Sequence, residues 1–232
     1  MAITRRQFLG YAAGAATLAL QLPPLDPERP IEIGPQWLLL DLQEHCSLRE
    51  SLAGYESALA ARCIRRETLS LPARCAGWIV PAAVRIPSRA CRAIATSLEA
   101  GTTVIVESGA GFAAGPDLRA HGVMLRDFLE VRTEAPVQLW TGAGHARSGA
   151  TPYVDYTWPS PTRVRDFSRV VPLERACARE IIAWVGGVPV GLRRRSGRGT
   201  LIFLGSPLGP ALWAGDPQAR RWLLDVLEFT ES

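Results

Sequence analysis

Short apolar runs alternate with helical segments along this chain, and this alternation limits the possible folds more than any other feature. Residues 37–42 and 102–107 are almost continuously apolar, without the in-and-out alternation of a strand that has one face in water. They indicate strands that are buried on both faces. Helical spacing follows over residues 47–66, and again from Pro116 to about Leu129. The order predicts a layered α/β domain with a mainly parallel sheet.

Further segments fit the same order. We expect short strands at residues 67–71 and 77–80, and a helix at residues 87–99 that ends at Gly101. Glycine at that place is the usual C-terminal stop of a helix.

The composition changes after Val137. Residues 141–163 are rich in Gly, Ser, Thr, Pro and aromatics and predict a long loop. Apolar runs separated by Gly-Gly and Ser-Gly then predict an antiparallel meander over residues 180–204. Asp216 and Pro217 fit the start of a final helix.

The first 22 residues have the form of an export leader. Arg5 and Arg6 precede Phe8-Leu9 and a weakly apolar stretch, and Pro23-Pro24 follow. This arrangement resembles the twin-arginine export signal. It predicts a signal peptide at residues 1–22, a Pro-rich linker at 23–35 and one domain at 36–232. The protein would meet the twin-arginine machinery and reach the periplasm or the cell exterior. The apolar stretch is shorter than the about 20 residues of a spanning helix, so no stable membrane span is expected.

Charge and cysteine content exclude several classes of partner. The chain has a net charge of +4, to which the leader contributes two arginines, so a nucleic-acid partner is not expected. The five cysteines form no C-x-x-C pair and the three histidines are scattered, so no metal site is expected.

One resemblance rests on three segments. They are Thr-Val-Ile-Val-Glu-Ser-Gly-Ala-Gly at residues 103–111, Leu-Arg-Asp-Phe-Leu at 125–129, and the glycine-rich hairpin at 197–209. Together they resemble the class I glutamine amidotransferase-like superfamily, in particular non-catalytic branches such as the trimerisation domains of β-galactosidases. The likeness spans roughly residues 35–230. It implies a flavodoxin-like three-layer α/β sandwich.

The catalytic pattern of that superfamily is not retained. Its nucleophile is a Cys on a tight strand-to-helix turn, whereas Ser108 stands at the matching place and the bulky Val106 precedes it. Ser206-Pro207 replace the expected His-x-Glu after the last strand. We therefore expect no assembled nucleophile and base, and no amidotransferase chemistry.

A ligand site is expected at the carboxyl edge of the sheet, where open α/β sheets bind ligands. Glu107, Ser108, Gly109 and Gly111 would line it together with the aromatic loop of Tyr156 and Trp158. The Gly-x-Gly of this loop also suggests a dinucleotide fingerprint, but Gly115-Pro116 fit that motif poorly, so no cofactor is expected.

Two functions follow as hypotheses. The first is an exported, non-enzymatic amidotransferase-like domain that binds a small ligand or a partner protein. The alternative is a periplasmic hydrolase or amidase that uses Ser108 or Cys46 as nucleophile with His45 or His145 as base. The arginines at residues 193–195 and 198 suggest either an anion-binding site or a group of solvent-exposed charges that protects an edge strand of the sheet.

Overall fold

The computed structural model describes residues 36–42, 48–66, 75–138, 153–166, 169–174 and 180–231, all within one compact unit. Several predictions lie outside these residues. They are the signal peptide, the linker, the strand at residues 67–71 and the candidates His45, Cys46 and His145.

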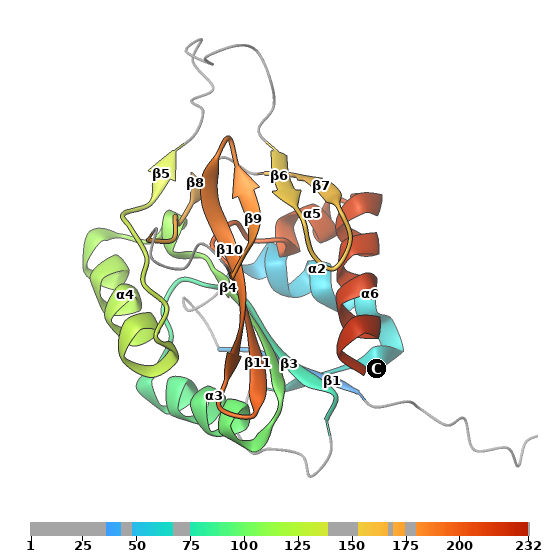
Figure 1. Cartoon of the computed structure of the whole chain (residues 1–232), viewed down its shortest axis with the longest axis horizontal. Coiled ribbons are helices and arrows are strands. Elements are labelled where there is room, and N and C mark those ends of the chain that lie inside the picture. Colours follow the sequence, from blue (N-terminus) through green and yellow to red (C-terminus); the bar gives the residue numbers. More distant parts are fainter. Residues whose placement is uncertain are drawn as a thin grey trace, which may run out of the picture. The chain divides into compact units, whose positions relative to one another are not determined.

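One mixed sheet of nine strands forms the centre of the domain (Figure 1), in the order β2-β1-β3-β4-β11-β10-β9-β6-β7. The first five strands pair in parallel. They are β2 (Cys63–Arg66), β1 (Trp37–Leu40), β3 (Gly77–Ala83), β4 (Thr103–Ser108) and β11 (Gly199–Leu204). Numbered in chain order, this half reads 2-1-3-4-5, which is the order of doubly wound sheets of the flavodoxin type.

The other half of the sheet is antiparallel, so the expectation of a mainly parallel sheet is only partly right. It consists of β10 (Val188–Ser196), β9 (Ile181–Val185), β6 (Tyr153–Tyr156) and β7 (Thr162–Arg165). The meander of β9, β10 and β11 is confirmed, and β11 also joins the parallel half by pairing with β4.

Two segments differ from the sequence prediction. The predicted loop contains the hairpin β6–β7, because Val154, Tyr156 and Val164 alternate with more exposed residues and add to the buried sheet. The predicted helix 47–66 ends at Leu59, and Cys63–Arg66 pair with β1 instead. In both places pairing with a distant strand decides the structure, which local spacing does not reveal.

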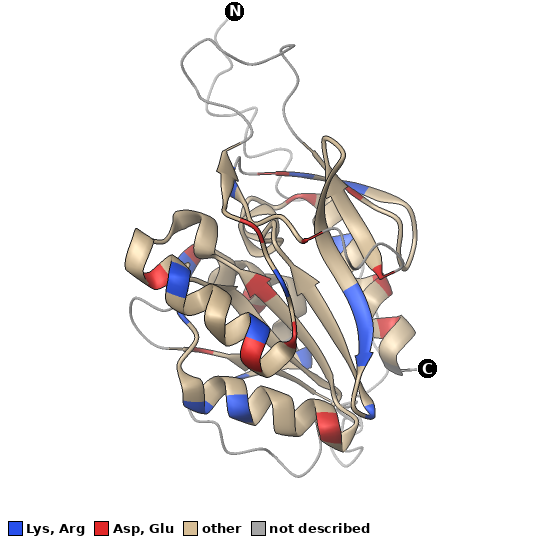
Figure 2. Ribbon diagram, turned by 60° about the vertical axis from the view of Figure 1, so that its left-hand side comes forward, with Lys and Arg blue, Asp and Glu red and all other residues tan. Residues whose placement is uncertain are grey.

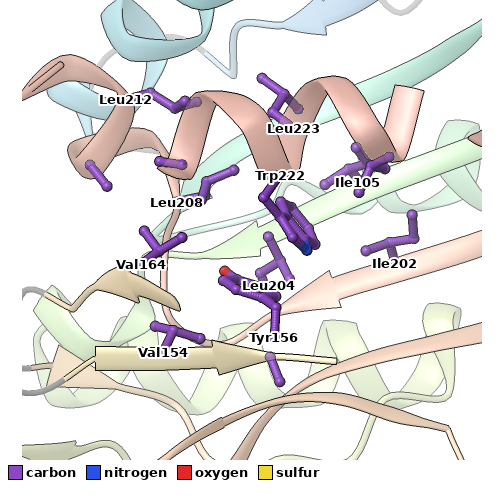
Figure 3. Packing of buried hydrophobic residues seen from close by; sticks show 14 of the residues in the cluster. Ile105, Val154, Tyr156, Val164, Ile202, Leu204, Leu208, Leu212, Trp222 and Leu223 are labelled. Carbon is purple, nitrogen blue, oxygen red and sulfur yellow. The ribbon is translucent and has the colours of Figure 1, made fainter. Parts of the chain in front are cut away.

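Helices cover both faces of the sheet (Figure 1). One face packs against α3 (Ser88–Ala100) and α4 (Gly115–Leu129), whose outer sides carry charged residues (Figure 2). The other face packs against α2 (Arg49–Leu59), α5 (Gly209–Trp213) and α6 (Pro217–Glu231). Figure 3 shows this second core, in which Ile105 and Ile202 from the sheet meet Trp222 and Leu223 from α6.

Local capping signals are confirmed at the helix ends. Gly101 follows α3 in the left-handed region, with φ of 106°. The Asp216 carboxylate accepts hydrogen bonds from the backbone N–H groups of Gln218 and Ala219 at the start of α6.

The β10–β11 hairpin adds arginine caps to two helices. Arg194 donates to the carbonyl of Leu129 at the end of α4, and Arg198 donates to that of Glu99 near the end of α3. Cations are favourable at helix C-termini, so these two arginines are structural.

Two smaller features complete the described part. Strands β5 (Val137–Gln138) and β8 (Arg169–Val170) form a separate two-stranded sheet beside α4. None of the described helices is long and apolar enough to cross a membrane.

Candidate functional site

Glu107 lies at the carboxyl end of β4, in the middle of the sheet, and its side chain is fully buried. Five protein groups donate hydrogen bonds to its carboxylate. They are the hydroxyls of Ser51 (2.7 Å) and Tyr55 (2.5 Å) and the backbone N–H groups of Ala82 (3.0 Å), Leu208 (2.8 Å) and Gly209 (3.1 Å). A carboxylate has about four acceptor positions. The protein itself therefore fills the acceptor capacity of Glu107.

These donors come from three directions. Ser51 and Tyr55 lie on α2, Ala82 lies on β3, and Leu208 and Gly209 lead into α5. Burial raises the pKa of Glu107, and its hydroxyl and backbone donors oppose that rise. Burial and the carboxylate also raise the pKa of Tyr55. The arrangement ties a helix, two neighbouring strands and the start of α5 to one side chain.

Ser108, the next residue, forms a pair with His121. The Ser108 Oγ and the His121 Nε2 are 2.9 Å apart, and the same Oγ accepts a hydrogen bond from the N–H of Ala110 at 3.3 Å. Which of the two groups donates depends on the tautomer of the imidazole. The other ring nitrogen, His121 Nδ1, is buried and has no hydrogen-bond partner in the part of the chain that the structure describes. Burial lowers the pKa of His121 to about 4, so the ring is neutral at pH 7.

The expectation that no base lies within reach of Ser108 is wrong. The base is His121 on α4, whereas only His45 and His145 were expected as bases. A signal was present, because His121, Leu125 and Leu129 share the buried stripe of the helix that directly follows β4. A histidine on that stripe points at the sheet.

The Ser108–His121 pair is sealed inside the protein. Each residue is about 1% exposed. Gly109 packs so tightly that a Cβ there would lie 2.2 Å from the carbonyl oxygen of Ala82, and a Cβ on Gly111 would lie 3.2 Å from the backbone of Arg169 in β8. The two glycines thus have a packing role: they let neighbouring backbone close over the end of β4.

The predicted aromatic residues divide between two places. Tyr156 is buried and its ring lies 4.2 Å from that of Trp222. Burial raises the pKa of Tyr156, as do the charges of Glu107 and Asp166. Trp158 instead contacts Phe229, at 5.1 Å between ring centres, and Arg193. The ligand-binding role of the six predicted residues stays a prediction.

A second buried carboxylate was not expected from the sequence. The Ser206 hydroxyl donates to Asp166 at 2.6 Å, and both residues are buried. Ser206 directly follows Gly205 at the end of β11, where the amidotransferase pattern would place its histidine. Among the described residues no group of three potential metal ligands is found, and Cys63, Cys75 and Cys91 are free thiols.

Known proteins were compared with this chain by sequence and by structure. No family model and no curated protein matches it. An exo-β-1,4-mannosidase from Opitutaceae bacterium strain TAV5 has a similar structure, with a TM-score of 0.56 and 13% identity over 83% of this chain. A β-galactosidase from Bacillus circulans sp. alkalophilus gives 0.55 and 13% over 81%. The likeness shows the fold alone.

The share of each neighbour that is matched differs greatly. This chain covers 36% of the mannosidase and 31% of the galactosidase, about a third of their length. It covers 100% of a cytoplasmic protein from Salmonella typhimurium LT2, at a TM-score of 0.57 and 10% identity over 85% of this chain. The fold therefore occurs both as part of large glycosidases and as a separate chain.

Proposed function

We propose that this chain is an exported, non-catalytic domain of the flavodoxin-like, amidotransferase-like architecture, and that it binds a small ligand or a partner protein. One observation carries the proposal: the groups at the nucleophile place are enclosed and are bonded to the protein itself. Ser108 and His121 are each about 1% exposed, and five protein donors hold Glu107. A nucleophile must reach its substrate, and this one does not.

The architecture supports the same proposal. The parallel half of the sheet has the 2-1-3-4-5 order, and helices cover both faces. Similar structures form about a third of a mannosidase and of a β-galactosidase. A fold that makes up only part of larger proteins is compatible with a binding role here. Export through the twin-arginine pathway is part of the proposal and rests on Arg5 and Arg6.

A serine-directed fluorophosphonate probe tests the absence of catalysis. The native protein should remain unlabelled at Ser108 at pH 7 to 8, as judged by mass spectrometry of its peptides. The Ser108→Ala variant provides the background. Labelling of Ser108 in the native protein, lost in Ser108→Ala and after denaturation, would overturn the proposal.

The second candidate is a serine hydrolase, because the Ser108 Oγ lies 2.9 Å from the His121 Nε2. In such a reaction the Ser108 Oγ would bond to an acyl carbon while its proton passes to His121 Nε2. Two features oppose it. Among the described residues no group bonds to His121 Nδ1 to orient the ring, and the N–H of Ala110 donates to Ser108 itself rather than to a substrate oxygen.

A further inference from the structure

Arg193 projects from β10 into a cluster with Trp158 and Phe229. Its guanidinium carbon lies 4.6 Å from the ring centre of Trp158 and 5.1 Å from that of Phe229. The two rings meet nearly at right angles, at 83°. Phe229 is 50% exposed, and Arg193 and Trp158 are partly exposed, so the cluster reaches the surface.

The Arg193 side chain includes a buried donor that has no acceptor in the described part of the protein. Its Nε is buried without a hydrogen-bond partner. Neighbouring arginines differ in this respect: Arg194 and Arg198 bond to helix carbonyls, and Arg163 bonds to Asp155 at 2.6 Å. A partly buried guanidinium without an acceptor is unfavourable and calls for an explanation.

The surroundings hold this cluster in place before any ligand arrives. The carbonyl of Trp158 accepts a hydrogen bond from Trp222 Nε1 at 2.8 Å, and the Ser160 hydroxyl donates to Asp225 at 2.6 Å. The β6–β7 turn is thereby fixed to α6, while β10, the strand that carries Arg193, lies between β11 and β9. A rigid site loses little conformational freedom on binding.

We propose that Arg193, Trp158 and Phe229 bind a sugar that carries a carboxylate or a phosphate. A guanidinium offers paired N–H donors that match the oxygens of either group. An aromatic side chain beside it offers an apolar surface with a fixed orientation to the ring of the sugar. The site deepens the proposed binding function and rests on it. It lies apart from the Ser108–His121 pair and needs no chemistry there.

Isothermal titration of the full chain tests the site with D-glucuronate and D-glucose 6-phosphate. D-glucose and inorganic phosphate serve as probes for the ring and the anion alone. We expect at least one acidic sugar to bind to the protein. D-glucose and inorganic phosphate should each bind to the protein at least tenfold more weakly than this acidic sugar. Comparison of the two acidic sugars distinguishes a carboxylate from a phosphate.

Variants locate the binding. Arg193→Gln should lower the affinity for the acidic sugar at least tenfold, and Phe229→Ala should lower it several-fold. Arg195→Gln, which removes an exposed arginine two positions away on the same strand, should leave binding unchanged. Thermal unfolding of each variant checks that it is folded. Arg193→Lys serves as a further variant, because it keeps the positive charge but lacks the paired N–H donors of the guanidinium.

The outcomes separate the two proposals. The site assignment is wrong if neither acidic sugar binds to the wild type. It is also wrong if an acidic sugar binds to Arg193→Gln and Arg193→Lys as tightly as to the wild type. In the second case binding itself stands. If inorganic phosphate binds as tightly as D-glucose 6-phosphate, the proposed role of the Trp158 and Phe229 rings is wrong. The non-catalytic function fails separately, through labelling of Ser108.

Discussion

The single carboxylate of Glu107 accepts hydrogen bonds from residues that lie up to 102 positions away from it in the sequence. Its burial is tolerated because each oxygen meets hydroxyl or N–H donors, whereas a buried charge without them is strongly unfavourable. The residue was expected at a ligand site because it is an acid at the carboxyl edge of a sheet. The structure gives it five protein donors, which the sequence could not reveal, since they come from α2, β3 and the start of α5.

Replacing Glu107 by Gln should lower the free energy of unfolding by about 2–4 kcal/mol, because an amide nitrogen would face N–H and O–H donors. Tyr55→Phe is the matched control, since it removes one donor and keeps the carboxylate, and it should cost only about 1–2 kcal/mol. Urea unfolding measures both. Equal unfolding midpoints for Glu107→Gln and the wild type would show that the carboxylate has no structural role.

His121 should make stability depend on pH between about 4 and 6.5. Burial lowers its pKa to about 4 in the folded protein, so the unfolded chain binds the proton more readily in this range. Stability therefore falls as the pH falls below 6.5, by up to about 3 kcal/mol at pH 4. His121→Leu should remove this contribution. Urea unfolding at several pH values checks it, and identical slopes for the two proteins would contradict it.

At the level of elements, local signals predicted the helices better than the strands. Gly101 and Asp216 mark the boundaries of α3 and α6 in the sequence as they do in the structure. The hairpin β6–β7 was read as a loop because its turn residues outnumber its buried ones. The short α5 was missed as well, and it positions Gly209 against α2. These elements depend on contacts with remote parts of the chain.

The contact between α2 and α5 requires a glycine. A Cβ on Gly209 would lie 1.9 Å from the Ser51 Oγ and 2.5 Å from the Ser51 Cα. Gly209→Ala should therefore lower the free energy of unfolding by at least about 2 kcal/mol through overpacking.

Gly122 provides the opposite case on α4. A Cβ there meets nothing within 4 Å. Gly122→Ala should raise stability by about 0.5–1 kcal/mol through helix propensity. In thermal unfolding, the Tm of Gly209→Ala should therefore fall and that of Gly122→Ala should rise. A Gly209→Ala variant as stable as the wild type would mean that α5 does not pack closely on α2.

For the whole molecule, the sequence indicated the α/β class and the meander but not how far the sheet extends. The parallel half follows from buried apolar runs such as Thr103–Ser108, whose lack of alternation marks strands covered on both faces. The antiparallel extension adds four strands beyond β11 to the five of the parallel half, and Arg193 and Trp158 lie in this extension.

Export also concerns the whole molecule. The double variant Arg5→Lys, Arg6→Lys should remain in the cytoplasm, because the twin-arginine machinery reads the arginine pair. Arg29→Lys, outside the pair, should be exported like the wild type. Cell fractionation with an immunoblot checks both. Equal amounts of the double variant and the wild type outside the cytoplasm would contradict the twin-arginine route.

The position of β4 has a consequence for the newly made chain. Its partner β11, and the N–H groups of Leu208 and Gly209 that donate to Glu107, are synthesised about a hundred residues after β4. A nascent chain that stops short of them has an open edge at β4, and the Glu107 carboxylate lacks two of its five donors. The sheet of this domain therefore completes its folding only after the C-terminal segment has left the ribosome. A translation product that lacks this segment is a substrate for proteases.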